Sequence, residues 1–84
     1  MDFVIVKCTP SAFKHGLTKK NIMCAMRKWV YDDVFDDDPE KFLLIGFDDN
    51  GNLLEIMYNI IDEHSVKVFH AMKCRNIMLS LLTN

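Results

Sequence analysis

The chain has 84 residues, half of them apolar and about a quarter charged, with a formal net charge of −2. This length and composition predict one folded, soluble domain spanning residues 1–84. No apolar run approaches the roughly 18 residues of a membrane span, and the N-terminus lacks the basic and apolar regions of a signal peptide, so we expect a cytoplasmic protein.

The N-terminal residues predict a strand followed by a short helix. The run FVIV, residues 3–6, is rich in β-branched side chains, which favours an edge strand. Pro10 suits the first turn of a helix, where its missing N–H is not needed. Gly16 then ends this helix as a glycine just past the last turn, so the helix is short.

A second helix is predicted over residues 18–29. Thr18 is a good N-cap residue. Apolar side chains recur at the i, i+4, i+7 spacing of one helical stripe: Ile22, Met26 and Trp29. The acidic stretch 31–41 breaks this period, so we expect a loop there that contains a short strand around residues 34–35.

The remaining residues predict an antiparallel meander and a last helix. The dipeptide Asn50-Gly51 is a strong signal for a hairpin with a type I′ turn. Its flanking runs and a third apolar run predict three strands: 42–47, 53–61 and 66–71. A helix follows over 72–82. This order predicts an α+β domain of two N-terminal helices, an antiparallel β-sheet meander and a C-terminal helix, with one sheet face free for function.

Charge is distributed unevenly along the chain. Residues 1–31 carry six Lys/Arg against one Asp (+5), residues 32–63 carry one Lys against eleven Asp/Glu (−10), and residues 64–84 carry three Lys/Arg (+3). If the two ends meet in the fold, they form a basic patch on an acidic protein. The alternative is that these charges simply coat exposed faces.

Two ionisable residues, Glu55 and His70, interrupt the apolar strands. An unpaired buried carboxylate is costly, so Glu55 either faces solvent or has a partner. Alternation places His70 on one face with Val66 and Val68. If the second and third strands pair, Glu55 and His70 could share an exposed face and act in general acid–base chemistry, because histidine titrates near neutral pH. An ordinary solvated sheet face is the alternative.

Four basic residues are further candidates. Arg75 suits a phosphate better than Lys73, because its guanidinium is planar, bidentate and always charged. The two differ by roughly 200° around a helix axis, so a helix beginning at residue 72 would not point both at one site. Lys14 and His15 stand just before Gly16, where basic residues also favour the helix dipole. For Lys73 and Arg75 the alternative is two solvated helix charges, and for Lys14 and His15 it is this interaction with the dipole alone.

We expect no metal ion and no cofactor. The three histidines lack the HxH or HxxxH spacing of a metal site, and no glycine-rich phosphate loop is present. The three cysteines, Cys8, Cys24 and Cys74, are odd in number and contain no CxxC pair. They predict buried or half-buried thiols rather than disulfides or a structural zinc site.

The order of the motifs carries a family resemblance. KHG (14–16) and a helix precede an acidic DP segment, the hairpin FLLIGFDDNGNLLEIMY (42–58) and VFHAMKCR (68–75). Over about residues 10 to 80 this resembles the BrnT-type toxins of bacterial toxin–antitoxin pairs. The family's last strand commonly ends in S-A-R-R. Here the corresponding residues are His70, Ala71, Met72 and Lys73, so Met72 stands in place of the first arginine.

The resemblance implies a RelE-like fold, RNA cleavage, and masking by a DNA-binding antitoxin of ribbon-helix-helix type. The implied activity is that of a metal-independent endoribonuclease, in which the RNA 2′-OH attacks its own phosphate. His70 would carry the proton, His15 would be the second titrating group, and Glu55 would orient His70. Three cations would bind the phosphate and stabilise its developing charge: Lys14, Lys73 and Arg75.

The expected partners are RNA, the antitoxin and a second copy of the chain. Two alternatives to the toxin remain open. The overall acidity and Met72 favour a non-catalytic protein-binding module on the same scaffold, in which the acidic stretch 32–40 and apolar helix faces meet a partner. The third alternative is an unrelated cytosolic α+β domain.

Overall fold

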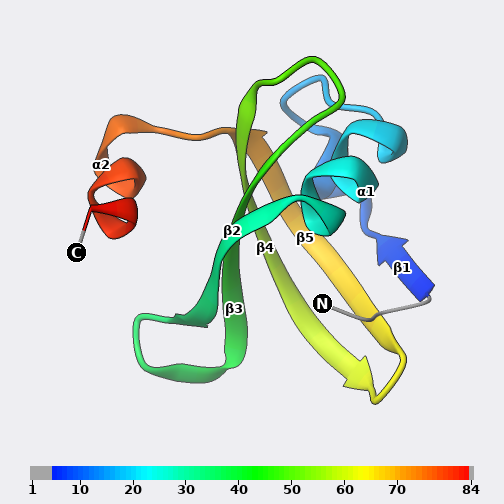
Figure 1. Ribbon diagram of the computed structural model, residues 1–84. Coiled ribbons are helices and arrows are strands. Elements are labelled where there is room, and N and C mark those ends of the chain that lie inside the picture. Colours follow the sequence, from blue (N-terminus) through cyan, green and yellow to red (C-terminus); the bar gives the residue numbers. More distant parts are fainter. Residues whose placement is uncertain (1–4, 84) are drawn as a thin grey trace.

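The computed structural model describes residues 5–83, which form a five-stranded sheet of order β1-β5-β4-β3-β2 flanked by helices (Figure 1). Among residues 5–83, no helix is long and apolar enough to cross a membrane. In chain order, with η for 3₁₀ helices, the elements are β1 (Ile5–Cys8), η1 (Pro10–Phe13), α1 (Lys19–Arg27), β2 (Trp29–Phe35), β3 (Asp38–Phe47), β4 (Leu53–Asp62), β5 (Ser65–Lys73), α2 (Asn76–Leu79) and η2 (Ser80–Leu82).

The sheet is mixed, so the predicted fold class is wrong. β1 runs parallel to β5, whereas the β2–β3, β3–β4 and β4–β5 pairs are antiparallel. Only one α-helix precedes the sheet's main strands, because the predicted first helix is a single 3₁₀ turn over Pro10–Phe13. The predicted edge strand lies partly outside the described residues, but Ile5 and Val6 belong to β1.

The acidic stretch is a hairpin rather than a loop, and the short strand expected around residues 34–35 is the end of β2. β2 pairs with β3 across it, mostly with residues 42–46, and Asp36 and Asp37 form the connection with φ of 54° and 56°. Two successive residues with positive φ are the mark of a type I′ turn. The type I′ turn predicted at Asn50-Gly51 is wrong, because of these two only Gly51 has positive φ, at 78°. Asp48 accepts from the Asn52 backbone N–H there, in a five-residue connection.

α1 covers one face of the sheet. Thr18 caps it through a capping box with Asn21, which confirms the predicted cap. The buried stripe of α1 contains Ile22, Ala25 and Met26, and it packs against Leu44, Leu54 and Ile56 of the sheet. Trp29 was predicted to belong to this stripe, but it starts β2 and is 44% exposed. The helix ends earlier because Lys28 is a non-helical C-cap, with φ −105° and ψ 42°, and its carbonyl accepts from the Phe47 N–H of β3.

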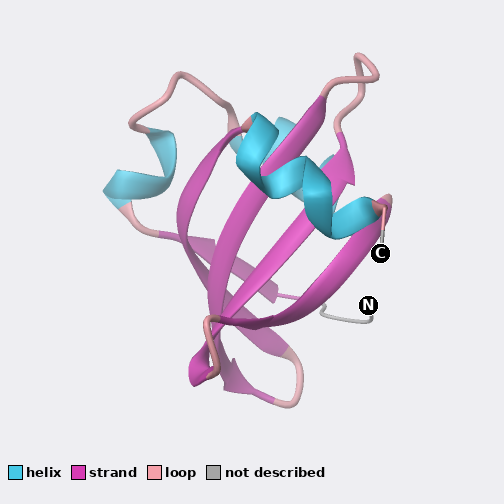
Figure 2. Ribbon diagram, turned by 90° about the vertical axis from the view of Figure 1, so that its left-hand side faces the viewer, coloured by secondary structure: helices cyan, strands magenta, loops and turns pink. Residues whose placement is uncertain are grey.

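The opposite face of the sheet is only partly free. α2 and η2 lie across it, on the side away from α1 (Figure 2). Leu43 and Ile45, which alternate with the core residue Leu44, are fully buried on this second face. The C-terminal helix predicted over 72–82 is shorter than expected. Residues 72 and 73 extend β5, and helical structure begins only at Asn76.

Candidate functional site

Glu55 is the centre of a polar network on the face opposite α1. It lies in β4 between Leu54 and Ile56, both buried in the α1 core, so alternation directs its carboxylate to the other face. The side chain is 0% exposed. It nevertheless accepts four hydrogen bonds, from three donors of Arg75 and one of His70. The partner that sequence reasoning required for a buried Glu55 is therefore present.

Arg75 holds Glu55 with both its backbone and its side chain. The backbone N–H and Nε donate to Oε1 at 2.9 and 3.0 Å, and Nη2 donates to Oε2 at 2.8 Å. This geometry arises because Arg75 is the extended N-cap residue of α2, with φ −76° and ψ 153°, rather than a helical residue. The side chain of Arg75 is half exposed, so one end of the guanidinium is accessible.

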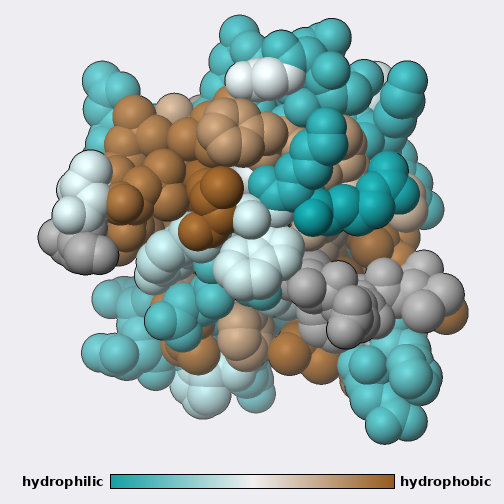
Figure 3. Space-filling model, viewed as in Figure 1, coloured by the Kyte–Doolittle hydropathy of each residue, from teal (hydrophilic) through white to brown (hydrophobic). Residues whose placement is uncertain are grey.

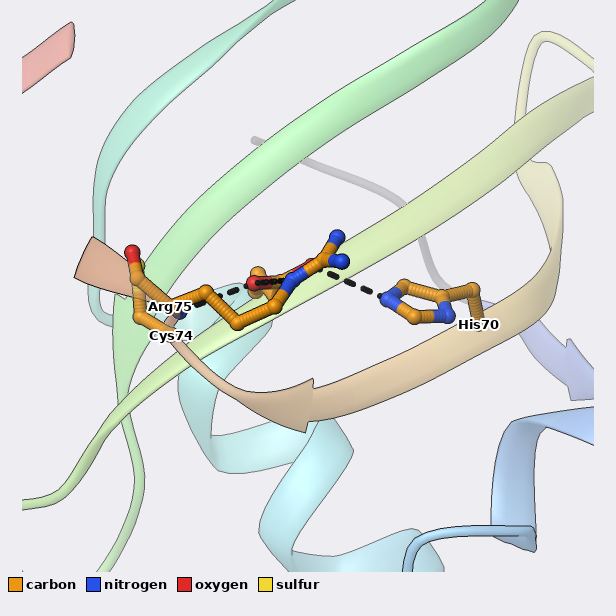
Figure 4. A network of polar contacts seen from close by, with 4 residues as sticks. His70, Cys74 and Arg75 are labelled. Atoms are coloured by element: carbon orange, nitrogen blue, oxygen red, sulfur yellow. Dashed lines mark hydrogen bonds and ion pairs between the residues drawn. The ribbon is translucent and has the colours of Figure 1, made fainter. Parts of the chain in front are cut away.

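His70 is oriented by the same carboxylate. Its Nε2 lies 3.0 Å from Glu55 Oε2, and 23% of its side chain is exposed. An ionised carboxylate accepts hydrogen bonds but donates none. In the neutral ring, Nε2 therefore carries the hydrogen and Nδ1 carries the lone pair. Figure 4 shows the second ring nitrogen turned away from the carboxylate. His70 is therefore arranged as a base at Nδ1.

His15 completes the cluster from the N-terminal part of the chain. Its ring meets the His70 ring edge-on, with centroids 5.8 Å apart and planes at 76°. The backbone is anchored nearby, because Thr9 N–H donates to the Val68 carbonyl and Ser11 Oγ donates to the Phe69 carbonyl. These bonds tie the segment of η1 to β5 and bring His15 to the strand.

Opposing influences act on the pKa of Glu55. Burial alone would raise it, but the hydrogen bonds from the Arg75 side chain and backbone, then from His70, outweigh burial, so the pKa of Glu55 is lowered. The hydrogen bonds and charge of Glu55 in turn raise the pKa of Arg75. The carboxylate is therefore ionised at neutral pH, as its role toward His70 requires.

A β-bulge puts His70 on this face. Met57 pairs with His70 and Tyr58 pairs with Val68, so Phe69 is an extra residue without a partner on β4. Val66 and Val68 point into the α1 core, and plain alternation would send His70 there as well. The prediction that these three side chains share one face is therefore wrong, because the bulge reverses the alternation.

The two lysines predicted for the site are placed differently. Lys14 is exposed and adjacent in the chain to His15, and its side chain makes no hydrogen bond or ion pair with the described part of the chain. Lys73 pairs with Leu54, whereas Met72 pairs with Glu55. Because paired residues share a face, Lys73 lies on the α1 side of the sheet, away from the cluster.

Sequence reasoning missed the two methionines that flank the network. Met57 is the cross-strand neighbour of His70, and Met72 is that of Glu55. Both are half-buried, so their thioethers border the polar groups with apolar surface. Only the register of β4 and β5 identifies them, and the bulge hides that register from a sequence pattern.

The remaining candidates concern metals and thiols. Within residues 5–83, no three His, Cys, Asp or Glu side chains are grouped so that they could hold a metal ion. Cys24 is buried, and Cys8 and Cys74 are half-buried free thiols. Burial raises the pKa of both Cys8 and Cys74, which makes them poor nucleophiles.

No family model matches the chain, and no curated protein or solved structure matches it either. The case for a function therefore depends on the geometry of His15, Glu55, His70 and Arg75, with the BrnT-type resemblance as a proposal beside it.

Proposed function

We propose that this protein is a metal-independent endoribonuclease that acts as a BrnT-type toxin. The observation that carries the proposal is the pairing of His70 with the fully buried carboxylate of Glu55, in ring contact with a second histidine. A cytoplasmic location belongs to the same proposal, as do an antitoxin of ribbon-helix-helix type and self-association. The antitoxin follows from the resemblance alone.

His70 is the general base. Its Nδ1 takes the proton of a ribose 2′-OH, while Glu55 holds Nε2–H and stabilises the imidazolium that forms. The 2′-oxygen then bonds to phosphorus. Because Glu55 is anchored by Arg75, the imidazole keeps one orientation throughout.

His15 is the general acid in this scheme. As the 2′-O–P bond forms, the P–O5′ bond breaks and the departing oxygen takes a proton from protonated His15. The products are a 2′,3′-cyclic phosphate and a 5′-hydroxyl. The edge-on contact of the two rings supports a pairing of acid and base in this scheme.

Arg75 and Lys14 stabilise the charge on the phosphate. Nε and Nη2 of Arg75 are engaged by Glu55, whereas Nη1 makes no hydrogen bond with residues 5–83 and donates to the phosphate. Lys14, exposed beside His15, adds a second cation. Lys73 has no part in the mechanism because it lies on the other face.

The test is cleavage of a long RNA in excess EDTA. His70→Ala and His15→Ala should each lower the rate at least about 100-fold, since each removes a proton-transfer group. The matched control is His64→Ala, because His64 is an exposed histidine in the β4–β5 connection, where it pairs with Glu63. The products should carry 2′,3′-cyclic phosphate ends.

Two outcomes would overturn the proposal. One is a folded wild-type protein that cleaves no RNA, and the other is a His70→Ala variant that cleaves at the wild-type rate. Circular dichroism of each variant separates lost chemistry from lost folding.

A protein-binding module is the second candidate, and one observation favours it. Apolar side chains are exposed along β2 and the C-terminal segment, where η2 contacts β2, and Figure 3 shows apolar surface gathered over that segment. The most exposed of them is Ile77, at 75%. If the wild-type protein is inert toward RNA, this surface becomes the leading site of function.

A further inference from the structure

Two lysines lie side by side where the chain's two basic ends meet. Lys7 of β1 is the register partner of Lys67 of β5. Both are exposed, and neither forms an ion pair within the described residues 5–83. Like charges in register across two strands repel each other and disfavour the pairing. The arrangement becomes favourable when an anion binds between the two ammonium groups.

The lysine pair lies on the same sheet face as His70. Val66 and Val68 are buried against α1, so Lys67 between them points to the other face. Across β4, Lys67 pairs with Asn59, and His70 pairs with Met57. Since Met57 and Asn59 are two residues apart on one strand, the lysines lie about 7 Å from His70 along the strand direction. That is roughly the length of one extended nucleotide unit.

A pocket opens beside the lysine pair. It has a volume of about 570 Å³ and lies where β3 and β4 part, beyond their last paired residues Phe42 and Tyr58. Figure 1 shows β3 and β4 diverging toward the bottom of the view. Its apolar lining includes Phe42, Ile60 and Ile61, and its polar lining includes Glu40, Asn59 and Lys67.

The polar groups around the pocket would orient a ligand inside it. The Asn59 amide nitrogen donates to the Glu40 carbonyl, which leaves Asn59 Oδ1 as an acceptor. The Glu40 carboxylate repels a phosphate from its side of the pocket, whereas Lys67 attracts one. An anionic ligand therefore places its phosphate at the lysines and its uncharged part against Phe42, with amino groups meeting the acceptors.

We infer that Lys7, Lys67 and this pocket form a subsite for the single-stranded nucleotide next to the scissile phosphate. The lysine pair binds the neighbouring phosphate, and the pocket takes the base, which stacks against apolar and aromatic side chains. This subsite deepens the ribonuclease proposed above and rests on it for the position of the scissile bond. A base with an exocyclic amino group fits the acceptors best.

The first test measures binding without cleavage. A fluorescein-labelled single-stranded RNA of 2′-O-methyl nucleotides has no free 2′-OH, so it binds but is not cut. Lys7→Ala/Lys67→Ala should weaken its binding about tenfold and reduce the slope of log affinity against log salt by at least about 0.7. The control Lys19→Ala/Lys28→Ala changes charge equally on the α1 side and should leave both quantities unchanged.

The second test asks whether the pocket recognises a base. Adenosine 5′-monophosphate should displace the labelled RNA at about one tenth of the concentration needed for ribose 5-phosphate, because only the former stacks. Equal potency would overturn base recognition. The phosphate site would be overturned if Lys7→Ala/Lys67→Ala bound the RNA with the affinity and salt slope of the wild type. It would also be overturned if the wild-type protein did not bind the RNA.

The binding and displacement experiments test the subsite independently of catalysis. His70→Ala should bind the labelled RNA as the wild type does while losing cleavage. If the wild type binds RNA through the lysines but cuts nothing, the ribonuclease fails and the nucleotide subsite stands. If it cuts RNA with unchanged rate and affinity in the lysine variant, the subsite fails and the ribonuclease stands.

Discussion

Replacing Glu55 by Gln tests the network that positions His70. The substitution keeps the volume but exchanges one acceptor oxygen for an amide that donates. Arg75 and His70 present only donors to this side chain, so two of the four hydrogen bonds become contacts between donors. A hydrogen bond to a buried charge contributes about 1.5–3 kcal/mol. We take the lower value for each bond, because Arg75 is half exposed and water can replace part of the loss.

Glu55→Gln should therefore lower the free energy of unfolding by about 3 kcal/mol, which for a domain of this size lowers the melting temperature by about 15 °C. Glu63→Gln is the matched control, because Glu63 is 86% exposed and, among residues 5–83, pairs only with His64. It should change the free energy of unfolding by less than about 0.5 kcal/mol. Urea denaturation of the three proteins at neutral pH measures both differences.

The pH dependence gives the second part of this test. The folded-state pKa of Glu55 is lowered from its ordinary value of 4.5. The stability from its ionised form is therefore fully present above that value and is lost as the pH falls through the lower folded-state pKa. The difference in the free energy of unfolding between wild type and Glu55→Gln should become smaller as the solution is acidified. Equal stability at neutral pH, or a difference that stays constant in acid, would refute the network.

Two further substitutions test the fold that carries the site. Gly46→Ala should destabilise the protein by about 3 kcal/mol, because the added methyl group collides with the Ala25 carbonyl and crowds Lys28 O at 3.1 Å; an unchanged urea midpoint would show that α1 does not lie against β3 as described. Asp37→Gly should raise the melting temperature by a few degrees, because Asp37 has a φ of 56°, which costs a residue with a side chain about 1 kcal/mol. A fall on calorimetry would contradict the type I′ assignment at Asp36 and Asp37.

The strands that sequence patterns located best are those buried on both faces. The predicted runs 42–47, 53–61 and 66–71 fall within β3, β4 and β5, because long apolar segments have few alternatives in a small domain. β2 was expected only around residues 34–35, because Trp29 fitted the helical stripe and Asp32 and Asp33 interrupt an otherwise β-prone sequence. Its pairing with β3 and the hydrogen bond from Tyr58 to Asp32 hold these two acidic residues in the strand.

No local sequence pattern could predict the parallel pairing of β1 with β5. It joins residues about sixty positions apart, and nothing in either strand records its register. The uneven charge did suggest that a basic patch forms if the ends meet. The register brings one lysine from each end together, Lys7 beside Lys67, although neither lysine was singled out beforehand.

Local backbone irregularity explains why the site itself was only half predictable. Glu55 and His70 were expected to share a face if their strands pair, but strict alternation along β5 sends His70 to the α1 side. One extra residue, Phe69, reverses that direction, and the Ser11 hydroxyl holds the Phe69 carbonyl. Arg75 depends on a similar exception. As a helical residue it would point elsewhere, but as the extended N-cap of α2 it directs both its backbone N–H and its guanidinium at Glu55. Bulges are common where a strand must turn a side chain toward a site. Here the bulge and the delayed helix start act on the same carboxylate, and this convergence is the strongest structural reason to assign the cluster a function.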